Sequence, residues 1–239
     1  MADTVTTLPG ASAPAAPVPT ASTDARRSPL LHRAEELARA GRPGPYGVEL
    51  REVPFLTQFN VRYRPGGGRS APDGFPLTPG LPGTPNTVRR GDDRTALWLG
   101  PDEWLVVAPP DAHAATEDAL RAAAEAVRTG AAEGDAGGAR VAYTDVSAHS
   151  TALRLGGARA RDVLRKVCAI DLHPRAFGAD ACAQTLLARG ARVLLVADRE
   201  PDGFLLFVRA SFADYVTDWL LDSMAEYAVG DGQCTNDGR

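Results

Sequence analysis

The feature that most constrains the fold of this chain is an internal similarity between residues 101–120 and residues 201–220. The two segments align without a gap: each begins with Pro-Asp, continues through an aromatic residue and a short apolar run, and ends in Asp-x-Leu. The apolar run has the length of a strand, and the residues after it have helical spacing. We therefore predict an α+β fold in which two pseudo-repeated hairpin-plus-helix units share one core, with the second half starting near residue 140.

The remaining elements follow from local periodicity. The helix expected at residues 211–227 has the clearest pattern, because its apolar residues recur at i, i+3, i+4, i+7 and i+8, and we interpret this stripe as core-facing. Its members are Phe212, Tyr215, Val216, Trp219 and Leu220. The other expected helices are 29–41, 112–128 and 158–168. The expected strands are 48–53, 55–63, 95–100, 104–108, 142–146, 151–155, 184–188, 192–197 and 203–209.

Two tails and one long loop fall outside these elements. Residues 1–28 are rich in Pro, Ala, Ser and Thr, so we expect a disordered tail, and residues 229–239 are expected to be flexible. The folded domain is predicted at 29–228. Residues 65–85 hold so many Gly and Pro residues that no regular element is expected, and such long loops are typically mobile or functional. Residues 130–138 are predicted to be a flexible connection.

Composition argues against several classes of protein. The formal net charge is -4, whereas a nucleic-acid-binding protein needs a strongly basic face. No apolar run approaches the roughly 20 residues of a membrane-spanning helix, and no secretory signal is present, so a soluble cytoplasmic protein is predicted. Cys168, Cys182 and Cys234 form neither a disulfide framework nor a CxxC pair, so we predict no metal site. Cys168 is expected to be a buried packing residue.

One group of polar residues has the composition of a hydrolase triad. Asp145, Ser147 and His149 alternate along an expected strand, so their side chains would lie on one face and point in parallel. A triad needs convergent groups with the histidine between the acid and the nucleophile. No G-x-S-x-G elbow and no G-x-G-x-x-G nucleotide-binding motif is present. We predict no catalytic and no cofactor-binding residues in this chain.

A second polar group, Asp171, His173 and Arg175, lies in the segment IDLHPRAFG. Pro174 and Gly178 predict a loop. The loop either binds a ligand carboxylate or phosphate, or forms a structured contact with another element or a partner, and we favour the second interpretation.

Two tryptophans and a charged segment are further candidates for partner contact. Trp98 and Trp104 flank the predicted turn at 101–102, and aromatic residues are favoured anchors in interfaces. Trp104 also aligns with Phe204 in the internal similarity, which favours a core role. Residues 89–93, which include two arginines and two aspartates, are interpreted as an exposed and solvated loop.

Several segments resemble the gamma subunit of heterotetrameric sarcosine oxidase, and the resemblance covers roughly residues 45–225. LGPDEWL and DLHPRAF are the most specific of them. The full set is NTV (86–88), LWLGPDEWLVVAP (97–109), DVS (145–147), TALRLGGARARDVL (151–164), CAIDLHPRAF (168–177) and CAQTLLA (182–188). REVPFLTQFNVR (51–62) and SFADYVTDWL (211–220) fit the same family.

This resemblance implies a complex of alpha, beta, gamma and delta subunits. Such a complex oxidises sarcosine to glycine and produces hydrogen peroxide, together with formaldehyde or methylenetetrahydrofolate. The resemblance places FAD, FMN, NAD, tetrahydrofolate and zinc on the other subunits. It implies that a gamma subunit is a non-catalytic structural component.

A more distant resemblance links the chain to the folate-binding fold of the glycine-cleavage aminomethyltransferase. In that family a strand–turn–strand unit carries a functional aspartate. The segment QTLLARGARVLLVAD (184–198) reproduces the unit, but Leu194 stands near the position of the aspartate. An apolar side chain cannot accept a proton, so we expect a non-catalytic relative of this fold. A stand-alone folate-binding protein is the alternative.

Overall fold

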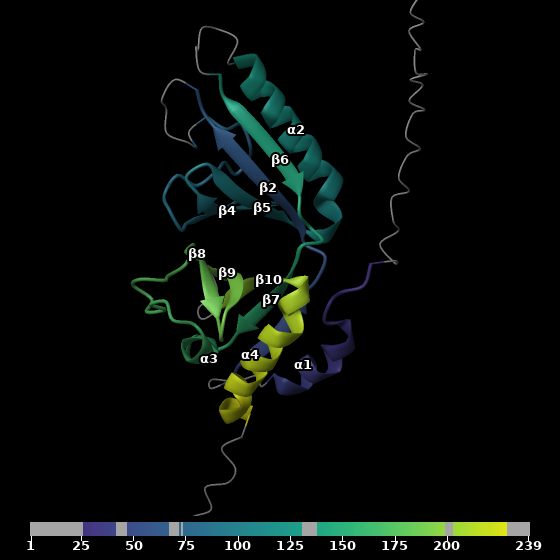
Figure 1. Ribbon diagram of the computed structural model, residues 1–239, viewed down its shortest axis with the longest axis vertical. Coiled ribbons are helices and arrows are strands. Elements are labelled where there is room, and N and C mark those ends of the chain that lie inside the picture. Colours follow the sequence, from purple (N-terminus) through teal and green to yellow (C-terminus); the bar gives the residue numbers. More distant parts are fainter. Residues whose placement is uncertain are drawn as a thin grey trace, which may run out of the picture.

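The computed structural model describes residues 26–41, 47–66, 72, 74–130, 138–198 and 203–228. In this part of the chain two five-stranded antiparallel sheets pack together, and helices cover their outer faces (Figure 1). We refer to the sheet with strand order β1-β7-β10-β9-β8 as sheet I, and to the sheet with order β3-β4-β5-β2-β6 as sheet II.

Sheet I carries helices α1, α3 and α4 on its outer face, where side chains such as Leu37, Val163 and Leu220 pack against the strands. Its strands are β1 (Glu49–Val53), β7 (Ser150–Gly156), β8 (Cys182–Leu187), β9 (Ala191–Ala197) and β10 (Phe204–Arg209), and its helices are α1 (Ala34–Ala40), α3 (Ala160–Val167) and α4 (Ala213–Ala228).

Sheet II carries helix α2 (His113–Gly130) on its outer face, with Leu120 and Ala123 buried against Trp104 and Val106. Its strands are β2 (Thr57–Arg64), β3 (Val88–Arg90), β4 (Thr95–Gly100), β5 (Glu103–Ala108) and β6 (Arg140–Asp145).

The described part of the 65–85 loop belongs to the core of sheet II. Phe75, Leu77 and Leu81 are buried, and the Trp104 indole N–H donates to the Pro82 carbonyl at 2.9 Å. The absence of regular structure in these residues is confirmed. Of the two expectations for such a loop, mobile or functional, mobility does not hold for them, because three apolar side chains are buried in the core.

A third apolar cluster joins the inner faces of the two sheets. Alternate residues of one strand point to opposite faces, so Trp104 and Val106 of β5 face α2 while Leu105 and Val107 face sheet I. In β9, Val193 and Leu195 face the helices, whereas Leu194 and Val196 face sheet II. Being buried on both faces explains why these strands are continuous apolar runs rather than alternating ones.

Every predicted helix and strand in the described residues is present, with boundaries shifted by a few residues. The hairpin at 95–108 is confirmed. Phe55 is an exception, because its φ of 63° places it in a turn before β2 rather than in the strand. The first helix begins later than predicted: the Ser28 hydroxyl accepts the Leu30 N–H at 3.2 Å, and a 3₁₀ turn (Leu31–Arg33) precedes α1. The tails 1–25 and 229–239 and most of the 130–138 connection lie outside the described residues.

The stripe on the last helix is only partly core-facing. Val216 and Leu220 are fully buried, but Phe212 and Tyr215 expose 43% and 36% of their surface. Among the described helices, none has an apolar stretch long enough to span a bilayer.

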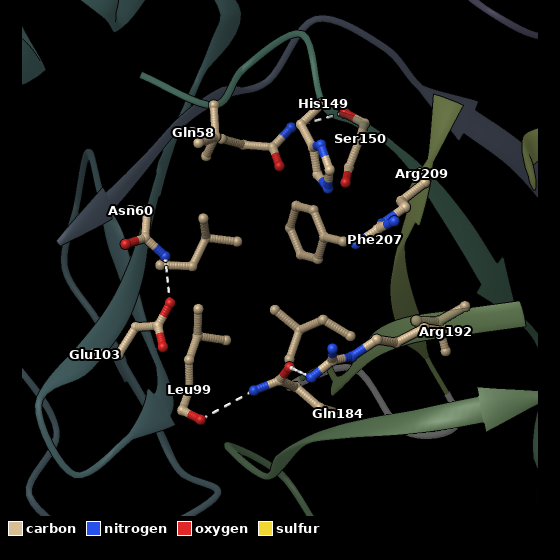
Figure 2. Close-up of a pocket in the computed structure, with 14 residues that line it drawn as sticks. Gln58, Asn60, Leu99, Glu103, His149, Ser150, Gln184, Arg192, Phe207 and Arg209 are labelled. Atoms are coloured by element: carbon tan, nitrogen blue, oxygen red, sulfur yellow. Dashed lines mark hydrogen bonds between the residues drawn. The ribbon is translucent and has the colours of Figure 1, made fainter. Parts of the chain in front are cut away.

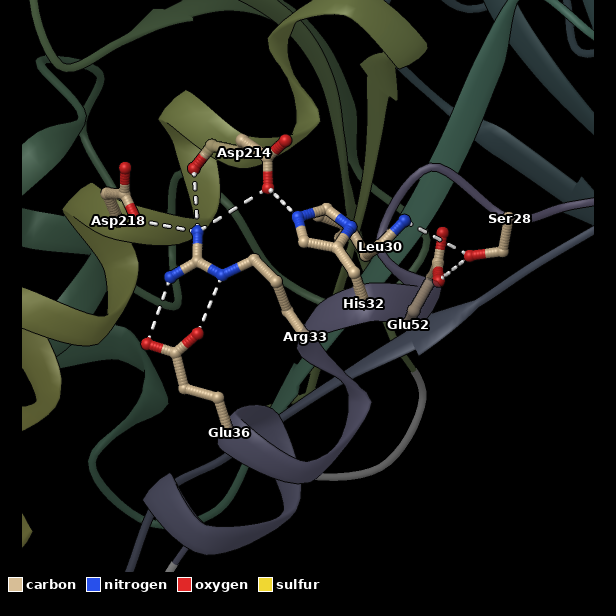
Figure 3. A network of polar contacts seen from close by, with 8 residues as sticks. All are labelled: Ser28, Leu30, His32, Arg33, Glu36, Glu52, Asp214 and Asp218. Atoms are coloured by element: carbon tan, nitrogen blue, oxygen red, sulfur yellow. Dashed lines mark hydrogen bonds and ion pairs between the residues drawn. The ribbon is translucent and has the colours of Figure 1, made fainter.

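A network of polar contacts fixes the first helical segment against α4 and β1 (Figure 3). The Arg33 guanidinium makes two hydrogen bonds to Glu36, donates to the Asp214 carbonyl at 3.2 Å, and forms an ion pair with Asp218 at 2.6 Å. Only 12% of the Arg33 side chain is exposed, so this segment is an integral layer of the fold.

Candidate functional site

A cleft of about 580 Å³ opens between the inner faces of the two sheets (Figure 2). The apolar cluster fills the rest of the interface between the sheets, and the cleft lies where polar side chains take the place of apolar ones. Those polar residues come from β2, β5, β7, β8, β9, β10 and the turn before β7; they are Gln58, Asn60, Glu103, His149, Ser150, Gln184, Arg192 and Arg209.

Two glutamines cross from one sheet to the other and frame the cleft. Gln184 of β8 donates its amide N–H to the Leu99 carbonyl at 2.9 Å, and Gln58 of β2 donates to the Ser150 carbonyl at 2.9 Å. Gln58 is 2% exposed, so its amide is committed to this contact. These bonds hold the two sheets at a fixed separation.

The floor of the cleft is apolar. Leu194 and Phe207 are register partners on β9 and β10, and Leu105 of sheet II lines the same space. All three expose less than 10% of their surface. The position that the distant resemblance associates with a functional aspartate is therefore part of this floor.

The charged groups of the cleft differ in how they are held. The Glu103 carboxylate accepts hydrogen bonds from Asn60 and Arg62, each at 2.8 Å, so its charge is balanced within sheet II. Arg192 donates to the Gln184 side-chain oxygen at 2.7 Å. The Arg209 side chain has no hydrogen bond or ion pair to any described residue. Sequence analysis missed these residues, because alternating polar positions on strands have no signal that separates a cleft from a solvated face.

The residues that have the composition of a triad do not form one. Asp145 ends β6, and Ser147 and His149 lie in the turn after it, so they do not share a strand face as predicted. Asp145 accepts from the Ser147 hydroxyl at 2.6 Å and contacts His113 at 3.1 Å, while His149 lines the cleft instead. Asp145 lies between Ser147 and His113, so among the described residues no histidine contacts the serine hydroxyl.

The electrostatics of Asp145 agree with a structural role. Partial burial raises the pKa of this carboxyl, but hydrogen bonds from the Ser147 hydroxyl and backbone N–H, together with His113, outweigh it and lower the pKa below its ordinary value. Asp145 is therefore an ionised acceptor that fixes the turn.

The loop with Asp171, His173 and Arg175 is stabilised by hydrogen bonds from its backbone N–H groups to its own side chains. Asp171 accepts the His173 N–H at 2.8 Å, and the His173 ring accepts the Arg175 N–H at 3.2 Å. Arg161 of α3 donates to the carbonyls of Leu172 and Phe177. The three polar residues of the loop are exposed at its surface, so they are accessible to a partner.

Two of the candidate partner contacts, Trp104 and Arg90, are held within the fold. Trp104 is fully buried, so it cannot touch a partner directly, whereas Trp98 is half-buried. Arg90 is not part of a solvated loop: it lies in β3, donates to Asp180 at 2.7 Å and to the Ala197 carbonyl at 2.7 Å, and links the two sheets.

The two cysteines in the described part of the chain serve packing. Cys168 and Cys182 are free and buried, and burial raises the pKa of the Cys182 thiol to about 11, against opposing effects of the Trp98 backbone and Arg90. A thiol with such a pKa is protonated and unreactive at neutral pH. In the described residues no group of histidine, cysteine or carboxylate side chains is arranged to hold a metal ion.

Comparison with known proteins agrees with this fold. The Sarcosine oxidase, gamma subunit family matches residues 77–226. The chain is 42% identical to a sarcosine oxidase subunit gamma of Corynebacterium sp. (strain P-1) and 40% identical to one of Arthrobacter sp.. Each alignment spans 208 residues, 87% of this chain and 94% of the relative.

Two solved structures are similar to this one. A chain of the heterotetrameric sarcosine oxidase from Corynebacterium sp. U-96 matches with a TM-score of 0.66 and 31% identity, over 86% of this chain and 98% of that chain. The glycine cleavage system aminomethyltransferase T from Bartonella henselae matches with a TM-score of 0.51 and 15% identity, over 82% of this chain and 57% of that one, which is a likeness of fold. This chain belongs to the sarcosine oxidase gamma subunit family.

Proposed function

We propose that this chain is the gamma subunit of a heterotetrameric sarcosine oxidase and that it contributes structure rather than chemistry. The observation that carries the proposal is the likeness to the Corynebacterium sp. U-96 complex, because the match spans 98% of a chain of that assembly. A protein that keeps the full fold of such a chain has the backbone framework on which the contacts of the assembly are built.

The partners in this proposal are alpha, beta and delta subunits, assembled in the cytoplasm. The complex oxidises sarcosine to glycine and releases hydrogen peroxide, with formaldehyde or methylenetetrahydrofolate as the one-carbon product. FAD, FMN, NAD, tetrahydrofolate and zinc belong to the other subunits. The apolar floor at Leu194 supports a gamma subunit without a proton acceptor at that position.

Partner contact is proposed at two exposed sites. The first is the loop at Asp171, His173 and Arg175, since exposed polar groups on a fixed backbone bind at little entropic cost. Half-buried Trp98 of β4 is a separate candidate contact. The second is the start of α4, where the rings of Phe212 and Tyr215 lie 6.3 Å apart and are exposed. Exposed aromatic residues are favoured interface anchors.

We also infer that residues 29–228 form one domain built from an internal repeat. Residues 110–112 and 210–212 each form a 3₁₀ turn, and α2 and α4 begin 100 residues apart, at His113 and Ala213. The strand orders correspond as well: β3-β4-β5-β2-β6 matches β8-β9-β10-β7-β1, so each half places its first strand at the edge of the other half's sheet. Such an exchange supports a pseudo-twofold pair.

Affinity purification tests the assembly. The tagged full chain is co-expressed with the flavin-bearing and zinc-bearing subunits of the same organism, and the expected result is one complex that contains all four chains. Phe212→Ser and Tyr215→Ser should reduce the yield of the complex, while Phe55→Ser, also near the surface but outside both proposed contacts, should not. Recovery of the tagged chain alone would contradict the proposal.

A further inference from the structure

We propose that the cleft between the two sheets binds an organic carboxylate, with Arg192 and Arg209 as the residues that hold its charged end. The inference rests on the cleft alone and goes beyond the assembly proposed above. A ligand of this class carries an apolar body next to its carboxylate.

Strand register brings the two arginines together. Val193 of β9 pairs with Val208 of β10, and Arg192 and Arg209 are the next residues on their strands, with both side chains lining the cleft. Facing side chains on neighbouring strands have Cβ atoms about 5 Å apart, and like charges there are destabilising. An anion that binds between them is attracted by both positive charges and offsets their mutual repulsion.

Among the described residues that line the cleft, no carboxylate is free to neutralise the two arginines. Glu103 accepts from Asn60 and Arg62, so its charge is already balanced. The Arg209 guanidinium has no hydrogen-bond or ion-pair partner among the described residues. His149, which is also exposed at the cleft, adds a third group able to bind an anion.

One of the arginines is already oriented. Gln184 uses its amide N–H to hold the Leu99 carbonyl and its oxygen to accept from Arg192 at 2.7 Å. Gln184 lies in the same sheet as Arg192 and is itself anchored to Leu99 of the opposite sheet, so it orients Arg192 and leaves the rest of the planar guanidinium available. Guanidinium groups bind carboxylates through two parallel hydrogen bonds, so an oriented arginine is suited to this ligand.

The apolar floor determines the chemical character of the rest of the ligand. Phe207, Leu194 and Leu105 lie beside the arginines, and Figure 2 shows the Phe207 ring between Arg209 and the open space of the cleft. A volume of about 580 Å³ falls within the usual range for small-molecule sites. The combination suits a flat, partly apolar acid better than a small inorganic anion.

Calorimetric titration of the full chain with benzoate, benzamide and acetate tests the proposal. Benzoate should saturate, benzamide should bind at least about tenfold more weakly because it lacks the charge, and acetate should bind more weakly because it lacks the ring. Arg209→Gln and Arg192→Gln should each weaken benzoate binding about tenfold or more. Arg165→Gln, which changes the net charge equally but lies on α3, should bind benzoate like the original chain.

A second measurement separates loss of a site from loss of folding. Because the Arg209 side chain makes no hydrogen bond or ion pair to a described residue, Arg209→Gln should leave the midpoint of thermal unfolding without ligand unchanged while it abolishes the stabilisation by benzoate. Equal binding of benzoate and benzamide, or undiminished binding by both arginine variants, would overturn the proposal. Benzoate binding that does not saturate, together with loss of subunit assembly in the arginine variants, would also overturn the proposal. That result would indicate that the arginines bind an acidic side chain of a partner subunit instead.

Discussion

At the scale of single residues, Trp98 and Trp104 show how burial separates similar side chains. They are register partners in the β4–β5 hairpin. Trp104 is fully buried and donates to the Pro82 carbonyl, whereas Trp98 is half-buried and makes no side-chain hydrogen bond to a described residue. The sequence places both beside one turn, and only the alignment with Phe204 favoured a core role for Trp104.

Trp104→Phe should lower the free energy of unfolding by about 2 kcal/mol or more, because it leaves a small void and removes the donor from a buried carbonyl. Trp98→Phe is the matched control and should cost less than about 1 kcal/mol. Urea unfolding followed by far-UV circular dichroism measures both. Equal losses for the two variants would show that the Pro82 contact contributes nothing.

Asp145→Asn should destabilise the protein in a way that depends on pH. The folded state holds the pKa of Asp145 below its ordinary value. The resulting stabilisation is present above the unfolded pKa of about 4 and is lost as the pH falls through the lower, folded pKa. The difference in unfolding midpoint between the two proteins should therefore be largest at pH 7 and shrink below about pH 4.

Asp222→Asn is the control for this prediction, because Asp222 is exposed and has no ion pair to a described residue. Its midpoint should follow that of the original chain at each pH. A difference between Asp145→Asn and the original chain that is the same at pH 7 and pH 3 would contradict the electrostatic account.

At the scale of elements, local patterns predicted the strands and helices other than β3, and the hairpin of β4 and β5, but not the pairing of strands far apart in the sequence. Apolar runs such as 193–197 and the helical spacing of 211–227 are encoded within a few residues of each other. By contrast β1 pairs with β7 and β6 with β2, across about 100 and 80 residues, respectively. Strand pairing of this kind depends on the whole core, so neither the order within each sheet nor the exposure of Phe212 could be predicted.

The attachment of the first helical segment to α4 gives a test at this scale. Arg33→Gln removes the charge that holds Glu36 and Asp218, and we expect a loss of about 1–2 kcal/mol in the free energy of unfolding, since the side chain is nearly buried. Arg39→Gln on the same helix should change it by less than about 0.5 kcal/mol, because Arg39 is 78% exposed. Hydrogen exchange of α1 amides should speed up only in Arg33→Gln. Equal effects of both variants would contradict a docking role for Arg33.

At the scale of the whole molecule, the site depends on how the two sheets face each other. Gln58 comes from the first half of the sequence, Gln184 and Arg209 from the second, and their roles follow from the separation of the sheets. In the sequence these residues resemble ordinary solvent-facing positions. The family could be predicted, because motifs such as LGPDEWL and DLHPRAF are contiguous. The cleft could not, because its polar side chains converge only in the folded chain.

As proposed above, this subunit supports a sarcosine-oxidising complex without performing chemistry. The most direct test measures sarcosine-dependent hydrogen peroxide formation per assembled complex with Ser147→Ala in this chain, since Ser147 and Asp145 form the cluster that most resembles a catalytic one. We predict a kcat within about twofold of the original complex. A fall of about a hundredfold or more, with all four subunits still assembled, would contradict the claim.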